Sequence, residues 1–329
     1  MPAALDFGRW TLAIPPFNLL PMNKSKLFLA TATAILLSLT ARAETFRLAA
    51  YNVENYLDQP TESRKNVKSD AAKAKVREVI LTMKPDVIAF GEMGSLSALL
   101  ELRDSLKKDG LDLPHYEHVT GFDTNIHVAV LSKFPIVARR SHTNANFLLN
   151  GKRFQVSRGF SEVDIKVNDQ YQFTLLGAHL KSRRQIAGAD EAELRHEEAK
   201  LLRSIVDKHL AQKPDANLVV LGDLNDTYNT KGVKEVIGTG KTKLVDTRPA
   251  EQNGDNLPNP ANPRYSPRNE AWTHYYGVED SYSRIDYILL SPGMAKEWVK
   301  DQTYIPVIAN WGQASDHRPV LATFEATNK

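Results

Sequence analysis

The chain of 329 residues contains no cysteine. This absence excludes a disulfide framework, a thiol nucleophile, a zinc–thiolate site and a lipid anchor attached to cysteine. Hydrophobic residues make up 42% of the chain and charged residues 25%, which rules out collagen-like, disordered and membrane-embedded proteins. The length is ample to bury a core, in one large domain or two small ones.

The N-terminal region contains a tripartite targeting pattern at residues 22–43. Lys24 and Lys26 provide a positive start, residues 27–39 form an apolar run, and Ala41-Arg42-Ala43 has the small-x-small pattern of a cleavage site. This order predicts a secretory signal peptide that is cleaved after Ala43. The apolar run is shorter than the roughly 20 residues of a membrane span, so we expect no stable membrane anchor. A buried N-terminal helix is the alternative.

Residues 1–21 precede this pattern, whereas a signal peptide normally starts at the initiator methionine. Our hypothesis is that Met22 is the true start and that residues 1–21 are an upstream extension. The mature protein would then be a single domain of residues 44–329, exported to the periplasm or the extracellular space. We expect a monomer and predict no protein partner.

The net charge of +3 does not belong to the mature domain. Residues 1–43 hold four basic residues and one acidic residue, and their removal leaves 38 residues of each sign. Total charge therefore does not steer the protein to polyanions. The stretch from Lys133 to Arg184 is nevertheless basic, with ten basic and three acidic residues. This stretch would favour an anionic substrate if it lined one face; scattered surface charge is the alternative.

Strands and helices are expected to alternate along the chain, with no internal repeat. The apolar patterns predict strands at residues 46–51, 86–90, 127–131, 154–167, 171–179, 218–221, 285–290 and 320–324, and helices at 69–83, 96–106 and 189–210. Residues 246–283 are proline-rich and predict a long functional or mobile loop. One α/β domain is therefore expected.

Polar side chains with oxygen or nitrogen ligands follow, interrupt or precede several of these apolar strands. In chain order they are Asn52, Glu92, Asp223, Asn225, Asp286, Asp316 and His317. An aspartate after a strand is usually a turn or cap residue. Asp286 is more informative, because an acid inside an apolar strand is costly to bury unless it pairs or binds something.

The donor chemistry of this set favours a hard divalent cation. Carboxylates and amide carbonyls suit Mg²⁺ first, with Mn²⁺ or Ca²⁺ as alternatives. Structural zinc is disfavoured by the lack of cysteine, although an Asp/His zinc site stays open. A divalent ion beside histidine and arginine fits phosphoryl chemistry, in which the metal neutralises phosphate oxygens and a His–Asp pair moves the proton.

Seven ordered segments that contain these residues resemble the endonuclease/exonuclease/phosphatase superfamily, which shares a fold with pancreatic-type deoxyribonucleases and apurinic endonucleases. The two sharpest motifs are Gly222-Asp223-Leu224-Asn225 and Ser315-Asp316-His317-Arg318-Pro319-Val320. The full set is 48–53, 87–92, 128–132, 177–182, 222–226, 284–289 and 315–320. The resemblance implies an α/β fold, a four-layer sandwich of two packed mixed β-sheets flanked by helices, with the site at one edge.

The resemblance also implies roles for individual residues. Glu92 would ligate the metal, helped by Asn52 and Asp316. Asp223 and Asn225 would orient the nucleophilic water and hold the scissile phosphate, and Asn52 would also contact substrate. His317 would face the phosphate and be oriented by Asp286, and His179 would contact a phosphate oxygen or protonate the leaving group. Arg158 and Lys181 would contact phosphate. The general base and the general acid stay unassigned among these groups.

One departure from the family pattern concerns the metal ligand Glu92: Gly91 stands before it where the family usually has glutamine, so a flanking hydrogen bond is expected to be lost. The sequence also offers no convincing acidic partner for His179, which argues against its role as a strong general acid. A structural role for His179 and a surface ion pair for Arg158 are therefore kept as alternatives. Trp272, Tyr275 and Tyr276 are expected to pack rather than stack on a base. The remaining histidines are expected to be structural: His115, His118, His127, His142, His196, His209 and His274.

The resulting prediction is an exported, divalent-metal-dependent phosphodiesterase that hydrolyses nucleic acid. A phosphomonoesterase or a lipid phosphodiesterase would use the same site, because substrate specificity on one fold resides in the loops. A basic groove with an aromatic platform would favour a nuclease, a closed pocket a small substrate, and an exposed apolar hairpin a lipid; no clear apolar hairpin is visible in the sequence. A non-catalytic phosphate-binding module is the third class.

Overall fold

A computed structural model of the chain describes residues 44–252, 261 and 271–327. The predicted extension at 1–21 and the predicted signal peptide at 22–43 lie outside the described residues. Ala43–Lys329 form one compact unit. Among the described helices, none combines the length and the apolar character that a membrane crossing requires.

The first sheet has seven strands in the order β12-β16-β17-β1-β2-β4-β3. β1 pairs in parallel with β2 and antiparallel with β17, so the sheet is mixed. The register sets Asn52 of β1 opposite Gly91 of β2, which brings Asn52 and the neighbouring Glu92 to one edge. The strands are β1 (Thr45–Tyr56), β2 (Val87–Met93), β3 (His115–Val119), β4 (His127–Ser132), β12 (Ala250–Glu251), β16 (Trp298–Ile305) and β17 (Val320–Glu325).

The second sheet has six strands in the order β11-β15-β10-β9-β8-β5. Asp223 of β10 lies opposite His179 on the parallel strand β9 and opposite Asp286 on the antiparallel strand β15. Three predicted site residues thus form one row across three strands. The strands are β5 (Ile136–Arg139), β8 (Phe160–Lys166), β9 (Gln172–His179), β10 (Leu218–Asp223), β11 (Val245–Asp246) and β15 (Asp286–Leu290).

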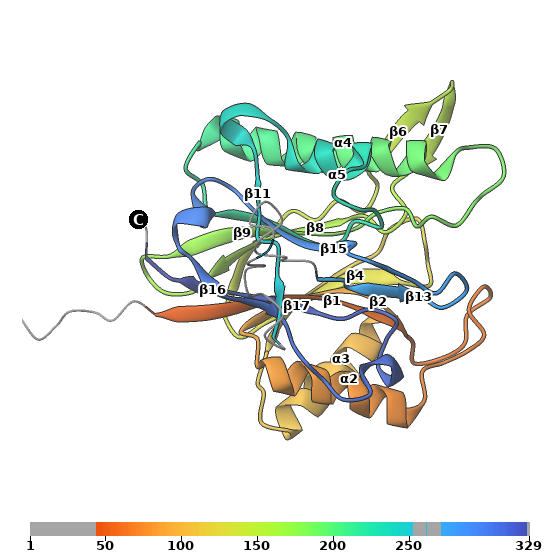
Figure 1. The fold of residues 1–329 in the computed structure, drawn as a ribbon, viewed down its shortest axis with the longest axis horizontal. Coiled ribbons are helices and arrows are strands. Elements are labelled where there is room, and N and C mark those ends of the chain that lie inside the picture. The colour runs from red at the N-terminus through yellow and green to blue at the C-terminus, as the bar shows by residue number, and fades with distance from the viewer. Residues whose placement is uncertain (1–43, 253–260, 262–270, 328–329) are drawn as a thin grey trace, which may run out of the picture. The chain divides into compact units, whose positions relative to one another are not determined.

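Helices cover the outer face of each sheet, as Figure 1 shows: α2 (Asp70–Met83) and α3 (Leu96–Lys108) on the first, α4 (Glu191–Gln212) and α5 (Lys231–Ile237) on the second. Local sequence sets their ends. Ser69 caps α2 by accepting a hydrogen bond from the Ala72 backbone, and the helix stops at the left-handed Lys84 before Pro85. The helices α2, α3 and α4 coincide with the predicted helices at 69–83, 96–106 and 189–210.

Three apolar clusters separate the resulting layers. The central cluster lies between the sheets and includes the ring of Phe46, whose centroid is 5.2 Å from that of Phe173 and 5.4 Å from that of Phe324. The second cluster joins the first sheet to α2 and α3, and the third joins the second sheet to α4 and α5. The predicted four-layer α/β sandwich is therefore confirmed.

The predicted strand at 154–167 is wrong in extent, because the structure divides it. Its first part belongs to β7 (Lys152–Gln155), which forms a separate hairpin with β6 (Asn146–Leu149), and its second part is β8. Gly159 at the break has φ +69°, and a Cβ there would lie 2.6 Å from the His142 carbonyl oxygen. The turn at Gly159 sends Arg158 out of the strand pattern.

The predicted long loop at 246–283 contains short strands where it is described. β12 joins the edge of the first sheet, and β13 (His274–Tyr276) pairs with β14 (Ser281–Ser283) in a small hairpin. Residues 253–260 and 262–270 lie outside the described part. β16 was not predicted, because the exposed Lys300, Asp301 and Gln302 interrupt its apolar pattern.

Candidate active site

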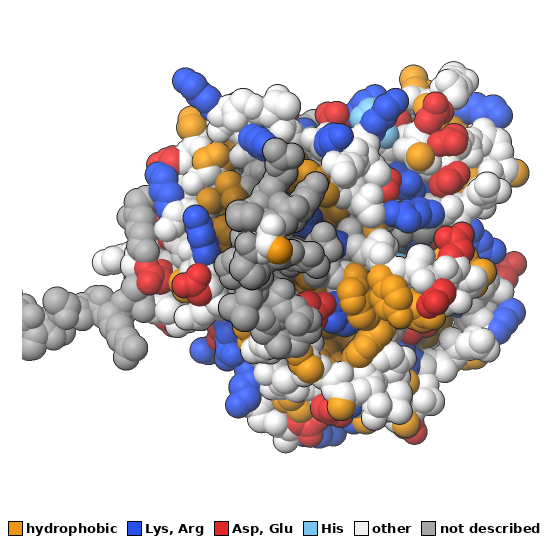
Figure 2. All heavy atoms as spheres, in the orientation of Figure 1, with side chains coloured by type: hydrophobic (Ala, Val, Ile, Leu, Met, Phe, Trp, Pro, Cys, Tyr) orange, Lys and Arg blue, Asp and Glu red, His pale blue; other side chains and the backbone are white. Residues whose placement is uncertain are grey.

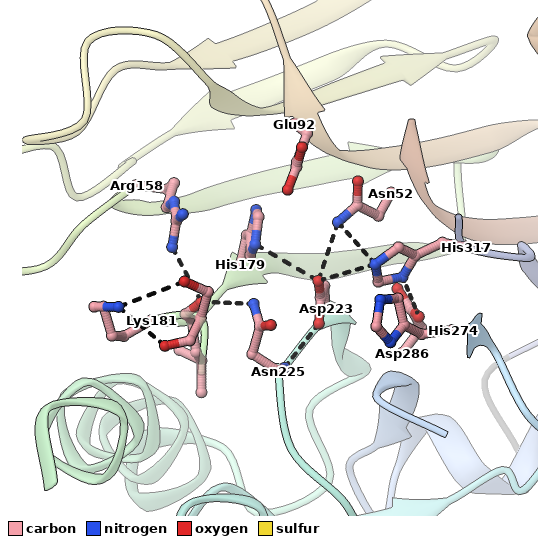
Figure 3. Close-up of polar contacts among 12 residues, drawn as sticks. Asn52, Glu92, Arg158, His179, Lys181, Asp223, Asn225, His274, Asp286 and His317 are labelled. Atoms are coloured by element: carbon pink, nitrogen blue, oxygen red, sulfur yellow. Dashed lines mark hydrogen bonds and ion pairs between the residues drawn. The ribbon is translucent and has the colours of Figure 1, made fainter. Parts of the chain in front are cut away.

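Asn52 joins the two sheets at the edge where their strands end. Its side-chain nitrogen donates a hydrogen bond of 3.0 Å to Asp223 Oδ2 and lies 3.3 Å from His317 Nε2 (Figure 3). Its carbonyl oxygen accepts a 2.8 Å hydrogen bond from the Ser315 hydroxyl, which itself accepts one from the His317 backbone at 3.0 Å. Residues from β1, β10 and the segment before β17 are thus held in one buried network.

His317 is oriented by Asp286, as the family resemblance implies. Its Nδ1 lies 2.8 Å from Asp286 Oδ2, and its Nε2 lies 3.8 Å from Asp223 Oδ2. Burial opposes the charged imidazolium, but the carboxylates of Asp286 and Asp223 outweigh it and raise the pKa of His317. The ring therefore favours the protonated form.

Asp223 is buried and is held by the turn that follows β10. Its Oδ1 accepts a 2.7 Å hydrogen bond from the Asn225 backbone, and the Asn225 side chain donates to the Leu180 carbonyl at 2.9 Å. Burial and the neighbouring Asp286 raise the pKa of the Asp223 carboxyl. Gly222 has φ +127°, and a Cβ there would lie 2.1 Å from the Ala178 carbonyl oxygen, so only glycine fits before Asp223.

His179 lies on the other side of Asp223. Its Nε2 is 3.5 Å from Asp223 Oδ2, which is therefore the acidic neighbour that the sequence did not reveal. Its Nδ1 is buried and has no hydrogen-bond partner within the described residues. A Cβ at Gly91 would lie 3.5 Å from this nitrogen, so the glycine leaves the place beside Nδ1 without a side chain. Burial, and after it the positive charge of Arg158, lowers the pKa of His179 and keeps the ring neutral.

Arg158 and Lys181 lie beyond His179, and the structure treats them differently. Arg158 is buried; its Nη1 donates to the Leu180 carbonyl at 3.2 Å, and its Nε lies 3.7 Å from Asp123 Oδ2. The ammonium group of Lys181 instead bonds the carbonyls of Ser182 and Arg184, at 3.0 and 2.8 Å. Arg158 is thus brought to the site, whereas Lys181 stabilises the loop that follows β9.

A buried glutamate on α4 organises this cationic side and was missed by sequence reasoning. Glu198 Oε1 accepts hydrogen bonds from the backbone and the hydroxyl of Ser157, both at 2.9 Å. Its Oε2 accepts a 2.6 Å bond from the Lys181 backbone. Glu198 therefore fixes the two segments that carry Arg158 and Lys181. An interior glutamate of an amphipathic helix gives no sequence signal of such a role.

The predicted metal ligands gather in part. Within the described residues, two groups of side chains place their ligand atoms within 4.8 Å of one another: His274, Asp316 and His317, and Asp223, Asp286 and His317. Glu92 belongs to neither group. In Figure 3 the Glu92 carboxylate points toward His179 and Asn52. Its Oε2 accepts a 3.0 Å hydrogen bond from the Asn55 backbone and lies 3.9 Å from Arg64 Nη1.

The charges around Asn52 fit a divalent cation. Burial, followed by the negative charges of Asp316 and Glu92, raises the pKa of Glu54. Asp286 Oδ1 is buried and has no hydrogen-bond partner among the described residues. Carboxylates that crowd in this way are stabilised when a cation binds between them, and oxygen donors suit a hard divalent ion.

A histidine and an aromatic hairpin beside His317 were also missed. The ring centroid of His274 lies 4.6 Å from that of His317, and its Nε2 lies 3.7 Å from Asp316 Oδ2, so His274 belongs to the site's surroundings. The hairpin β13–β14 exposes Tyr276, Val278 and Tyr282. Hydrophobic side chains gather on this face over β13 in Figure 2.

Trp272 packs beneath this hairpin, as the sequence predicts. Its ring centroid is 4.8 Å from that of Tyr282 and 5.1 Å from that of Trp311. The guanidinium group of Arg318 lies 3.4 Å from the centre of the same ring. Trp272 is therefore engaged within the fold and does not offer a free stacking surface.

On the Arg158 side the site adjoins a pocket of about 900 Å³. Cationic and aromatic side chains share its lining, which is the composition that binds anionic ligands with planar groups. The cations are Arg64, Arg153, Arg158, Lys181 and Arg184, and the large apolar residues are Phe122, Phe147, Phe154, Ile186 and Leu194.

Solved structures of known proteins share this architecture. No curated protein matches the chain significantly in sequence. Among solved structures, truncated TDP2 from Caenorhabditis elegans is similar with a TM-score of 0.56 and 15% identity, over 86% of this chain and 98% of that one. Sphingomyelinase C from Streptomyces griseocarneus gives 0.55 and 18%, over 86% and 100%. The human Nocturnin catalytic domain with bound sulfate gives 0.56 and 15%, over 86% and 95%.

These identities support the shared fold alone, whereas the sequence of the chain identifies its family. The family described as endonuclease/exonuclease/phosphatase matches residues 49–317, which spans every site residue from Asn52 to His317. The buried Asn52–Asp223–His317 network and its acidic surroundings are intact within that match. The chain therefore belongs to the endonuclease/exonuclease/phosphatase family and is an enzyme of its metal-dependent phosphoester hydrolase class.

Proposed function

We propose that this enzyme is an exported phosphodiesterase that hydrolyses nucleic acid, with Mg²⁺ as its metal. The observation that carries the proposal is the cationic pocket beside His179, which joins the phosphate site through Arg158. A phosphomonoester needs no such extension, whereas a polyanion gains affinity from each cation that contacts a further phosphate. The basic stretch of the sequence contributes four of the five lining cations.

The side chains divide the work of hydrolysis among them. Glu92, Asn52 and Asp316 would hold the metal ion, which when bound supplies positive charge to the phosphate oxygens. Protonated His317, oriented by Asp286, donates a hydrogen bond to a phosphate oxygen. Asp223, whose raised pKa makes its carboxylate more basic, accepts the proton of the attacking water while Asn225 holds the turn around it.

On the opposite side, His179 and Arg158 contact the substrate. Burial keeps His179 neutral, so that it donates a hydrogen bond without adding a second imidazolium next to His317. Arg158 contributes a buried guanidinium with one N–H that lacks a partner in the described structure. This hydrogen-bonding capacity fits a phosphate oxygen.

A lipid phosphodiesterase is the second candidate, and the exposed β13–β14 hairpin favours it. Val278 at its turn is 82% exposed, and the tyrosines Tyr276 and Tyr282 flank it. The pocket argues against a choline lipid, because its arginines repel a quaternary ammonium group. A non-catalytic module is disfavoured, because the acidic network would repel itself without a cation.

The substrate class is tested by direct competition. The purified protein is assayed with Mg²⁺ against plasmid DNA, RNA, sphingomyelin vesicles and bis-p-nitrophenyl phosphate. We expect hydrolysis of nucleic acid and of the small diester, and no choline-phosphate release. Release of choline phosphate without nucleic-acid cleavage would replace the nuclease proposal with the lipid one.

Export rests on the pattern at residues 22–43. Expression of the full chain in a bacterial host, followed by fractionation and N-terminal sequencing, tests it. We expect a monomer in the periplasm or medium, beginning at Glu44. An exported protein that begins at Met1 would contradict both the cleavage after Ala43 and the start at Met22.

A further inference from the structure

Three segments of the chain supply most of the lining of the pocket beside Arg158, and Arg64, Leu194 and Glu198 are among the residues that complete it. The three segments are the loop at 122–125 between β3 and β4, the hairpin β6–β7, and the loop at 181–187 after β9. None of these segments carries the Asn52–Asp223–His317 network. The pocket is therefore a second binding feature, joined to the phosphate site by Arg158.

The cationic side chains of the pocket differ in the hydrogen bonds and ion pairs that they make within the protein. Arg153 donates a hydrogen bond to the Asn146 side chain, and Arg64 contacts Asn55 and Glu92. For the guanidinium group of Arg184, the described part of the chain provides no hydrogen bond or ion pair. Arg158 Nε, at the inner end of the pocket, lies 3.7 Å from Asp123 Oδ2 but is buried and lacks a hydrogen-bond partner among the described residues. Both groups retain capacity for an external anion.

Its apolar residues occupy the rim and one wall. Phe122 is 69% exposed and Ile186 43% exposed. Behind them Phe147 and Phe154 stack at 6.0 Å with an interplanar angle of 21°, which gives the hairpin wall a firm backing. The exposed ring of Phe122 shares the pocket with guanidinium groups that keep hydrogen-bonding capacity. This combination matches a nucleotide, whose base stacks while its phosphate is held by charge.

The size of the pocket favours a single strand over a duplex. A volume of about 900 Å³ is in the range of sites that enclose one small ligand. Bases in a duplex are stacked and paired inside the helix, so none can enter such a pocket without being turned out of the stack. A single strand presents its bases freely.

Resting on the proposed nuclease function, we propose that this pocket binds one unstacked nucleotide of a single-stranded nucleic acid, next to the scissile phosphate on the Arg158 side. Arg184 and Arg158 contact phosphates, and the base lies against Phe122. The enzyme therefore cleaves single strands, or the single-stranded parts of folded nucleic acids, faster than duplexes. Membrane binding by the same rim is the competing interpretation, since Leu148 on the hairpin is also exposed.

The test measures kcat/KM of the full-chain protein with Mg²⁺ on a labelled single-stranded oligonucleotide, on its duplex and on bis-p-nitrophenyl phosphate. The variants are Phe122→Ala and Arg184→Gln. Matched controls are Val137→Ala, an exposed apolar residue on β5, and Lys133→Gln, an exposed cation that pairs with Asp86 before the start of β2. Asp86 and Glu92 lie at opposite ends of β2, so this control is remote from the site.

We expect each pocket variant to lower kcat/KM on the single strand about tenfold and to leave the small diester unchanged. The two controls should match the unaltered protein on every substrate. Unchanged single-strand cleavage in both pocket variants, or faster cleavage of the duplex by the unaltered protein, would overturn the inference and leave the nuclease proposal standing. Hydrolysis of the small diester without cleavage of either oligonucleotide would instead refute the nuclease proposal itself. Sphingomyelin hydrolysis that falls in Phe122→Ala would assign the rim to a membrane.

Discussion

Asp286 Oδ2 lies 2.8 Å from His317 Nδ1, so the other ring nitrogen of His317 is directed at the Asn52–Asp223 pair. Asp286 reaches this position because it starts β15 opposite Asp223 at the end of β10. The charge of Asp286 also raises the pKa of His317 against the effect of burial. Asp286 is therefore a positioning residue that acts through His317.

Asp286→Asn should lower kcat about 10²-fold with little change in KM, because the ring loses both its orientation and its charge partner. Since Asp286 raises the pKa of His317, its removal should lower that pKa and move the alkaline limb of the pH–rate profile to lower pH. The measurement is kcat against pH on bis-p-nitrophenyl phosphate. A uniform loss of rate without a shifted profile would indicate a merely structural role.

Glu198→Gln should impair the cationic side of the site. Glutamine has one acceptor oxygen, so an NH₂ group would face either the Ser157 or the Lys181 backbone donor. We expect a stability loss of about 1–3 kcal/mol and a rise in KM for oligonucleotides. Urea unfolding and steady-state kinetics measure the two effects. Glu197→Gln, which removes only a contact with Lys200, is the matched control, and equal behaviour of the two variants would contradict the assignment.

Gly91→Ala should hardly change the stability of the protein, whereas Gly222→Ala should lower it clearly. A Cβ at Gly91 meets its nearest neighbours at 3.5 Å, an ordinary van der Waals distance, so stability should change by less than about 1 kcal/mol. At Gly222 a Cβ would meet the Ala178 carbonyl oxygen at 2.1 Å with φ +127°, so the loss should exceed about 2 kcal/mol. Urea unfolding measures the stability of both variants. Similar losses would contradict the expectation that only Gly222 requires glycine.

The free energy of unfolding should depend on pH through the carboxyl group of Glu162. Burial alone would raise its pKa, but hydrogen bonds from His142, His209 and Arg140 hold the pKa far below its usual value. A depressed folded-state pKa stabilises the protein fully above the unfolded value of about 4.3. This contribution declines as pH falls below that value and is lost only as pH falls through the folded-state pKa. Glu162→Gln should therefore destabilise the protein at pH 7 by about 1–3 kcal/mol, and the penalty should be smaller near pH 3. Asp169→Asn, which replaces an exposed carboxylate, should leave the stability unchanged at both pH values. A penalty that stays equal at the two pH values would contradict the prediction.

The sequence predicts those site residues that follow apolar strands, because strand ends in an α/β sandwich meet at one edge. Asn52 and Asp223 are predicted in this way, and His317 is predicted because it precedes the last strand in a family-like motif. Glu198, His274 and the pocket were not, because each depends on contacts between distant segments that leave no local pattern. Gly159 shows the same limit: the apolar run on either side of it predicts one strand, and only the approach of the His142 carbonyl explains the turn.

We propose that Asp223 and His317 form the core of a metal-dependent phosphodiesterase site. The most direct measurement is plasmid nicking by the purified protein with Mg²⁺ or with EDTA, with Asp223→Ala and His317→Ala assayed in parallel and checked for folding by circular dichroism. We predict nicking with Mg²⁺ that EDTA abolishes and that both variants lose by at least about 10²-fold. Nicking that survives EDTA, or that either folded variant retains at full rate, would contradict the claim.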